Sequence, residues 1–101
     1  MLPIAQTPEP PYYAVVFTSH PGADQDGYAE TAHRMVALAS RQPGFLGIEA
    51  AGSDPQIVVS YWRDAEAIRA WKAHAEHQLA QRLGRERWYG AFRVRVCKVE
   101  R

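Results

Sequence analysis

Four segments of the chain have the apolar patterning and residue types of β-strands, and they predict four strands. Residues 12–19 are rich in β-branched and aromatic side chains, which is typical of a strand. Their two rows are Tyr13, Val15 and Phe17 on one face and Tyr12, Ala14, Val16 and Thr18 on the other. Because both rows are largely apolar, we expect both faces to be covered. Further strands are predicted over 45–51, 57–62 and 88–99, and the turn at 52–55 joins the middle two as a hairpin.

Two segments between these strands have the three- and four-residue apolar spacing of amphipathic helices. The first can be capped by Asp24 or Asp26, and its apolar stripe consists of Tyr28, Ala32, Met35, Val36 and Ala39. The second begins after Asp64, whose carboxylate can accept a backbone N–H, and ends before Gly84. The order strand, helix, strand, strand, helix, strand predicts an α+β protein of ferredoxin-like βαββαβ topology, an antiparallel sheet with two helices on one face.

Such a sheet leaves its other face bare. Apolar residues occupy both sides of the strands at 12–19 and 88–99, so we expect a second copy to bury the bare face and form a symmetric homodimer. Residues 1–11 are rich in proline and are predicted to form an extended or loosely held N-terminal leader. The folded domain is then expected to span residues 12–101.

Composition narrows the classes of protein. A chain of 101 residues is long enough for one core, and its net charge of +1 without a basic run argues against nucleic acid or a membrane surface as partner. No apolar run approaches the about 20 residues that span a bilayer, and no signal peptide is visible, so a cytoplasmic location is predicted. The single cysteine, Cys97, excludes an internal disulfide and is expected to be a small buried residue.

Candidate chemistry gathers between residues 60 and 89, which hold all three tryptophans and two of the four histidines. On a helix, Ile68, Ala75 and Leu79 share the arc expected to pack on the sheet. At three- and four-residue spacing beside that arc lie Trp71, His74, His77 and Gln81, which can line one wall of a cavity. Tryptophan grouped with polar side chains favours such a cavity over a plain apolar core.

In the functional interpretation, an aromatic ligand stacks on Trp71 and Trp62 while His77 or His74 accepts a phenolic proton. An imidazole titrates near pH ~6.5, which suits this proton transfer at neutral pH. Arg93 or Arg87 would then steady the negative charge, and the phenol of Tyr13 can face the ligand or the core.

An architectural alternative stays open for each of these side chains. His77 and Gln81 can simply secure the helix end by hydrogen bonds, because buried polar groups need partners. Trp62, at a strand end, can equally belong to the core or to a pocket wall. The histidines at 74 and 77 lack the HExxH spacing and an obvious third ligand, so no metal site is expected.

Short motifs throughout the domain carry a resemblance to a known family. They are Pro43-Gly44-Phe45-Leu46-Gly47, Ser60-Tyr61-Trp62, Trp71-Lys72, Glu76-His77, Ala80-Gln81, Gly84-Arg85-Glu86-Arg87-Trp88-Tyr89 and Arg95-Val96. With these motifs the chain resembles the antibiotic biosynthesis monooxygenase (ABM) family of the dimeric α/β-barrel group, from residue 12 to the C-terminus. The resemblance implies a ligand held between the helices and the sheet of each protomer.

What the resemblance implies about activity is broader. Some members are similar to cofactor-independent monooxygenases that oxidise aromatic polyketide phenols to quinones, and others resemble haem-degrading enzymes. In the haem-degrading branch an iron-ligating histidine follows a helical tryptophan by ten residues, whereas counting from Trp71 leads to Gln81. We therefore expect a monooxygenase that acts on a small aromatic molecule without a cofactor. The alternatives are a haem-binding or haem-degrading protein and a non-catalytic small-molecule-binding dimer.

Overall fold

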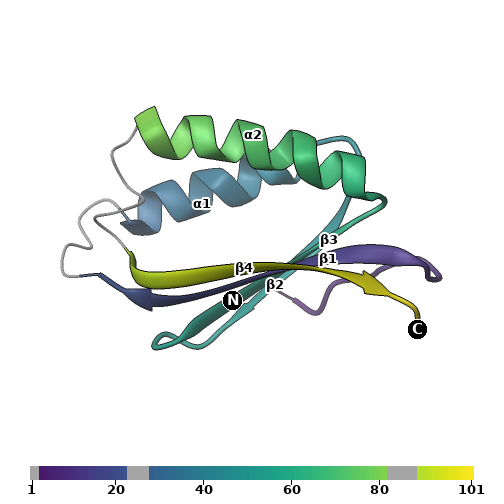
Figure 1. The fold of residues 1–101 in the computed structure, drawn as a ribbon, viewed down its shortest axis with the longest axis horizontal. Coiled ribbons are helices and arrows are strands. Elements are labelled where there is room, and N and C mark those ends of the chain that lie inside the picture. Colours follow the sequence, from purple (N-terminus) through teal and green to yellow (C-terminus); the bar gives the residue numbers. More distant parts are fainter. Residues whose placement is uncertain (1–2, 23–27, 82–88) are drawn as a thin grey trace.

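Four antiparallel strands form one sheet, and two helices cover one of its faces (Figure 1). The structure, a computed structural model, describes residues 3–22, 28–81 and 89–101. Its elements in chain order are β1 (Tyr12–Pro21), α1 (Tyr28–Ala39), β2 (Phe45–Ala51), β3 (Gln56–Trp62), α2 (Ala65–Gln81) and β4 (Tyr89–Val99). The predicted ferredoxin-like βαββαβ fold is confirmed. The predicted signals at Asp24, Asp26, Gly84 and Trp88 lie outside the described residues.

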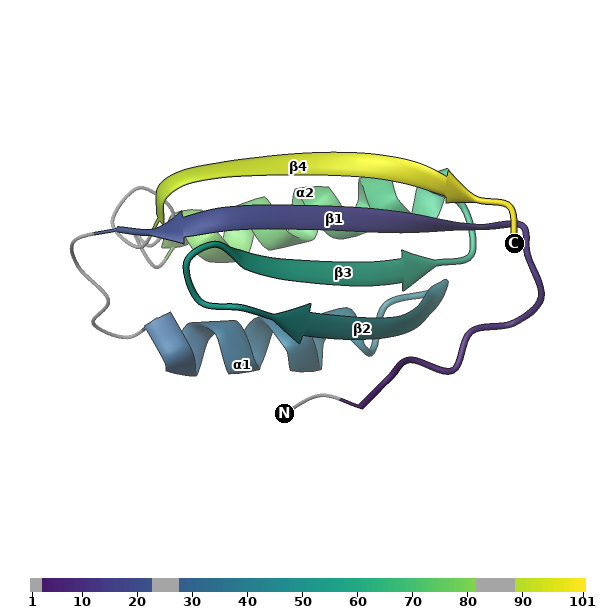
Figure 2. The ribbon, with the colours of Figure 1, turned by 90° about the horizontal axis from the view of Figure 1, so that it is seen from below.

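The strands are ordered β2-β3-β1-β4, so β1 and β3 are central and β2 and β4 form the edges (Figure 2). Residues directly opposite one another in an antiparallel ladder point to the same face. Tyr13 lies opposite Trp62, Val15 lies opposite Val96, and both Tyr13 and Val15 pack against the core beneath the helices. We call this helix-facing side the inner face and the opposite side the outer face.

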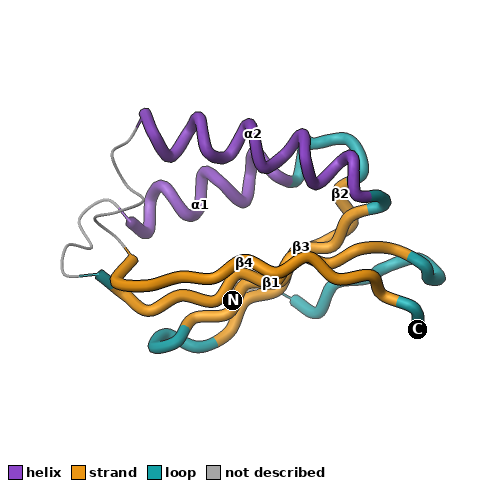
Figure 3. The backbone as a smooth tube through the Cα atoms, viewed as in Figure 1, coloured by secondary structure: helices purple, strands orange, loops and turns teal. Residues whose placement is uncertain are grey.

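The start of α2 is fixed against the start of β2. Asp64 caps the helix as predicted, because its Oδ1 accepts the Ala67 N–H at 2.8 Å. The Arg63 N–H donates to the Gly44 carbonyl at 2.7 Å, and Figure 3 shows the loop before β2 beside the first turn of α2. Gly44 has φ +86°, and a Cβ there would lie 2.7 Å from the Ala67 Cβ. Only glycine fits this close approach without strain.

The core lies where α1, α2 and β3 meet. Ala39, Trp62 and Ile68 are its buried centre, and the partly buried side chains packed against it are Tyr13, Val15, Phe45, Ala67 and Trp71. The prediction that Ile68 packs on the sheet is confirmed. No helix in the described ranges has both the length and the apolar character that crossing a membrane requires.

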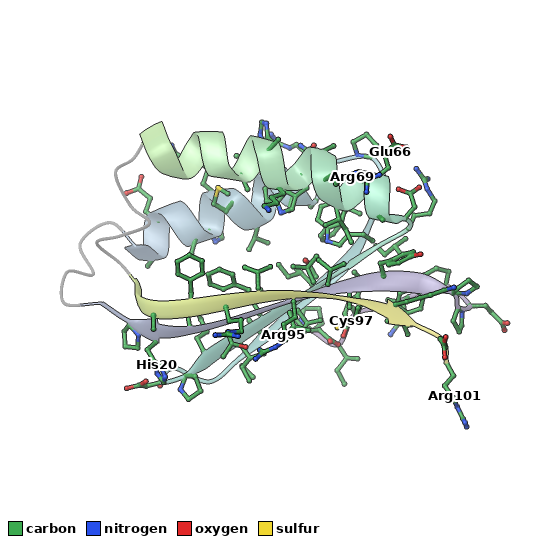
Figure 4. The ribbon with its side chains drawn as sticks, in the orientation of Figure 1. His20, Glu66, Arg69, Arg95, Cys97 and Arg101 are labelled. Carbon is green, nitrogen blue, oxygen red and sulfur yellow. The ribbon has the colours of Figure 1, made fainter. Side chains whose placement is uncertain are left out.

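The strand β4 has a mixed outer row. Its register on β1 places Phe92, Val94 and Val96 on the inner face, while Arg93 and Arg95 lie opposite Thr18 and Val16 on the outer face. Cys97 and Val99 share that outer face, so apolar residues occur on both sides of the strand, as expected. Cys97 is exposed rather than buried, and Figure 4 shows it, with Arg95, pointing away from the helices.

The N-terminal leader lies against the outer face at β2. The Ala5 N–H donates to Glu49 Oε2 at 3.0 Å, and Thr7 Oγ1 is hydrogen-bonded to the Tyr12 hydroxyl at 2.9 Å. A Cβ at Gly47 would lie 2.7 Å from the Ala5 Cβ, so the leader occupies the space that a side chain there would need. Specific contacts therefore hold the leader on the sheet.

Candidate functional site

Trp62 is the most deeply buried large side chain described, with 0% of its surface exposed. It ends β3 on the inner face, and its indole Nε1–H donates to Ser60 Oγ at 2.9 Å. The Phe45 ring meets it edge-on, with ring centres 5.4 Å apart and planes at 84°. Its polar atom is satisfied and its ring is enclosed, so Trp62 belongs to the core. The sequence had left core and pocket wall equally open.

Trp71 extends this aromatic group from β3 onto α2. Its ring stacks on Trp62 with centres 6.0 Å apart and planes at 23°, and its side chain is only partly buried. The His74 ring lies one helical turn further on, 5.8 Å from Trp71 and tilted by 35°. The predicted spacing therefore does bring an indole and an imidazole together. Because Trp62 supports one face of Trp71, the orientation of the Trp71 ring is fixed by the core.

The imidazole of His74 carries the clearest chemical signal of this group. Its Nε2 is buried and has no hydrogen-bond partner within the part of the chain that the structure describes. A buried polar atom without a partner costs about 1–3 kcal/mol, and proteins usually avoid that cost. A ligand hydroxyl that reached this nitrogen would remove the cost and would place an exchangeable proton on a basic atom.

The other predicted site residues are distributed unevenly. Tyr13 lies on the inner face opposite Trp62 and packs against the same core, so it is on the correct side for a ligand beneath α2. Arg93 is on the outer face, opposite Thr18, and the sheet separates it from Trp71 and His74. The helix α2 passes through positions 77 and 81, but the side chains of His77 and Gln81 lie outside the described residues.

The inner row of β4 adds a feature that the site prediction missed. Phe92, Val94 and Val96 face the helix layer, yet 39%, 48% and 56% of their surfaces are exposed. An apolar strip is thus partly accessible on the same face as Trp71 and His74. Alternation had predicted the strip itself, but not how far its side chains are exposed.

A second polar group lies on the outer face and holds the leader. Glu49 of β2 accepts hydrogen bonds from the Tyr61 hydroxyl at 2.5 Å and from the Ala5 N–H at 3.0 Å. These bonds stabilise the carboxylate and lower the pKa of Glu49 below its ordinary value. The hydrogen bond to Glu49 raises the pKa of Tyr61 to about 12, with burial and nearby charge adding to the effect. The Tyr12 ring meets Tyr61 edge-on at 5.9 Å.

We call these five residues, Ala5, Thr7, Tyr12, Glu49 and Tyr61, the outer cluster. Its hydrogen bonds join the leader to β1 and β2 and join β2 to β3, so the outer cluster holds the leader on the sheet. In the described ranges no group of three or more His, Cys, Asp or Glu side chains is arranged to bind a metal. Sequence reasoning missed the pair of Glu49 and Tyr61 because neither residue belongs to a chemical motif.

Comparisons with known proteins agree with this architecture. A family model described as antibiotic biosynthesis monooxygenase matches residues 11–83. The chain is 51% identical over 100 residues to the uncharacterized protein YqjZ of Bacillus subtilis (strain 168), with 97% of this chain and 88% of YqjZ covered.

Two solved structures illustrate the range of proteins with this fold. A variant of SnoaB, a cofactor-independent oxygenase from Streptomyces nogalater, matches with a TM-score of 0.71 and 16% identity over 91% of this chain and 96% of that chain. A variant of MhuD, the heme-degrader of Mycobacterium tuberculosis, with two manganese protoporphyrin IX molecules per active site, matches with a TM-score of 0.60. The MhuD match has 21% identity and covers 86% of this chain and 93% of that chain. At these identities the likeness establishes a common fold.

Proposed function

The chain belongs to the antibiotic biosynthesis monooxygenase family, and from that premise we propose that it is a cofactor-independent monooxygenase of a small aromatic, polyketide-like phenol. The observation that carries the proposal is the buried Nε2 of His74, which has no hydrogen-bond partner among the described residues and lies beside the half-buried Trp71. An indole face and a basic nitrogen side by side suit a flat ring that bears a hydroxyl group. SnoaB, a cofactor-independent oxygenase of similar fold, supports the same reaction class.

In the proposed reaction, His74 takes the phenolic proton and leaves an electron-rich phenolate against Trp71. A ring carbon of the phenolate bonds to one atom of O2, and the resulting hydroperoxide loses water as a carbonyl forms. The phenol becomes a quinone, with one oxygen atom in the quinone and the other in water. The four electrons that O2 accepts all come from the substrate, so the reaction needs no external reductant.

Other candidate residues take supporting roles in this proposal. Trp62 fixes the orientation of Trp71 through the stacked contact, and Tyr13 lies on the substrate side of the sheet. His77 remains the alternative predicted base and Gln81 a predicted substrate contact, because they follow His74 at three and seven residues along α2. Arg93 is not assigned to the phenolate, because its row points to the outer face.

Haem is the competing ligand that the likeness to MhuD raises. Iron ligation requires an imidazole nitrogen that is open toward a large planar macrocycle. The Nε2 of His74 is instead buried, which suits a small hydroxyl reached by local side-chain movement better than an iron porphyrin. The described residues therefore do not fit haem, and no step is assigned to it.

We also propose that the protein acts as a homodimer that pairs through the outer face of the sheet. Ile57 is 41% exposed there, and Val59 and Val16 share the same face. A sheet with one uncovered, partly apolar face is stabilised when a second copy covers it. Sedimentation equilibrium over a range of protein concentrations tests this part of the proposal separately from catalysis.

The activity is tested by incubating the protein with anthrone-type phenols under ¹⁸O2 and measuring oxygen consumption and product mass. We expect one labelled oxygen atom in the quinone. General-base catalysis contributes about 10²–10⁴-fold, so we expect His74→Leu to lower kcat by about that factor. The matched control is His33→Leu, which removes an exposed imidazole from α1 and should leave kcat unchanged.

Each other outcome has a clear meaning. Turnover that persists in both His74→Leu and His77→Leu would refute the proposed base. Quenching of tryptophan fluorescence by a phenol without oxygen consumption would identify a non-catalytic binder. A Soret band on adding hemin that shifts in His74→Leu would favour the haem-binding alternative.

A further inference from the structure

The leader forms a raised edge on the outer face along β2. Ala5 rests directly against Gly47, and its N–H is bonded to Glu49, both of which belong to β2. Figure 2 shows the leader turning back from the start of β1 to run past β2 toward the N-terminus. A backbone hydrogen bond to a carboxylate is among the stronger kinds. The leader is therefore a fixed part of this surface.

The exposed side of the leader is apolar at one position. Ala5 and Thr7 are partly buried toward the sheet, whereas the neighbouring side chains of Ile4 and Gln6 are exposed. Among them Ile4 is 80% exposed, the largest exposed fraction given for a large hydrophobic side chain in the described residues. A large apolar side chain presented on an anchored segment is a natural contact for another protein surface.

The opposite edge of the outer face has complementary chemistry. On β4 the outward row carries Arg93 and Arg95, both exposed, and Figure 4 shows Arg95 pointing away from the helices. At the β2 edge, Glu49 is held as a carboxylate by two donors. A carboxylate has about four acceptor positions, so Glu49 retains capacity for a guanidinium. The β2 edge thus carries the leader and a carboxylate, whereas the outer row of the β4 edge carries two guanidinium groups.

We propose that in the homodimer the leader of each copy lies across β4 of the other copy. Ile4 packs on the aliphatic stems of the partner's Arg93 and the partner's Arg95, and Glu49 accepts hydrogen bonds from these guanidinium groups. This arrangement rests on the proposed homodimer and adds its geometry. A two-fold axis that runs along the strands, between β1 and β3, places the raised edge of each copy over the bare edge of its partner.

The other face-to-face arrangement is disfavoured by the same two features. A two-fold axis perpendicular to the strands would place β4 over β4 and β2 over β2. Arg93 and Arg95 of one copy would then face the same residues of the other, and like charges in contact are unfavourable. The two leaders would also compete for the same space above Gly47.

The proposed contact can be tested by two charge changes. Each should weaken the dimer when present alone, and the two should be compatible in a mixed dimer. Ile4→Lys places a positive charge against the basic row of the partner, and Arg95→Glu places a negative charge against the carboxylate of the partner. Each variant alone should raise the dimer Kd about tenfold or more in sedimentation equilibrium. The matched control is Arg69→Glu, the same charge change on the exposed surface of α2, which should leave Kd unchanged.

An equal mixture of the two variants decides whether the two positions touch. The mixed dimer contains one unaltered contact and one contact between opposite charges, so native mass spectrometry should find it well above its statistical share of about one half. A statistical mixture, or singles that dimerise like the unaltered protein, would overturn the proposed geometry. A protein that is monomeric at every concentration would refute the homodimer itself, and phenol turnover would still report on the catalytic proposal.

Discussion

The two faces of the sheet differ in how their polar atoms are hydrogen-bonded. On the outer face, the Tyr61 hydroxyl and the Ala5 N–H both donate to the Glu49 carboxylate. These bonds lower the pKa of Glu49, and the bond to Glu49 raises the pKa of Tyr61. On the inner face, the core indole of Trp62 is satisfied by Ser60, while the nearby Nε2 of His74 is buried without a partner in the described residues. The polar atoms of this outer group are thus hydrogen-bonded within the protein, whereas the inner face contains a buried nitrogen that a ligand could bond.

The difference distinguishes side chains that stabilise the fold from a side chain that is available to a ligand. A satisfied network stabilises a single arrangement, whereas an unsatisfied buried atom costs stability and persists where it serves a ligand. Trp62 and His74 are separated only by Trp71, yet they should respond to substitution with opposite signs. All stability measurements below are made at one protein concentration, because dimerisation would otherwise shift the apparent values.

The largest expected effect is at the enclosed end of the aromatic stack. Trp62→Ala removes the side chain with 0% exposure, and the cavity and lost contacts should cost about 3–5 kcal/mol in urea denaturation. Replacing the exposed Arg69 of α2 by alanine should cost less than about 0.5 kcal/mol as a control. A loss below about 1 kcal/mol for Trp62→Ala would mean that this ring is a pocket wall rather than core.

The next effect has the reverse sign. His74→Leu replaces an imidazole whose buried Nε2 has no hydrogen-bond partner among the described residues by an apolar side chain of similar size, and we expect the free energy of unfolding to rise by about 1 kcal/mol. The control His33→Leu changes an exposed imidazole and should alter stability by less than about 0.5 kcal/mol. If His74→Leu is instead destabilised, the imidazole supports the fold, and the contrast between the two faces fails.

The leader provides a third effect, confined to the outer face. Gly47→Leu fills the space where the Ala5 Cβ lies and should release the leader without unfolding the sheet. Amide hydrogen exchange at Ala5 should accelerate about tenfold or more as the bond to Glu49 is lost. Ala51→Leu, an exposed position on the same face of β2, should leave that exchange rate unchanged. Unaltered exchange in Gly47→Leu would show that the leader is held elsewhere.

Local features of the fold were predictable because each depends on neighbours in sequence. The strand predicted over residues 12–19 showed which side chains share a face, since a strand has a period of two. The Asp64 cap was predictable because an N-cap bonds to a backbone N–H three residues later. The helical spacing of Trp71 and His74 likewise predicted that their rings would meet.

Features that depend on register or on distant segments could not be read from the pattern. Glu49 and Tyr61 meet because β2 and β3 pair in one register, and a shift of one residue would separate them to opposite faces. The contact of Ala5 with Gly47 joins residues far apart in sequence, and a proline-rich composition does not predict it. Whether Trp62 is core or pocket wall depends on where α2 lies, which periodicity does not fix.

The smallest effect tests the outer cluster through pH. The pKa of Tyr61 is raised from 10.0 to about 12, so between these values the unfolded chain loses a proton that the folded chain keeps. The free energy of unfolding should therefore fall as pH rises from 10 to about 12. Because the pKa of Glu49 is lowered from 4.5, its contribution to stability is present above that value and is lost as the pH falls through the lowered pKa.

Tyr61→Phe removes the hydrogen bond that Tyr61 and Glu49 share. It should therefore flatten the alkaline limb of the curve of stability against pH and weaken the acid limb. The matched control Tyr12→Phe should retain both limbs. An alkaline limb of unchanged slope in Tyr61→Phe would show that the bond between Tyr61 and Glu49 does not stabilise the fold. The proposed contrast between a stabilising outer face and a ligand-binding inner face would then fail.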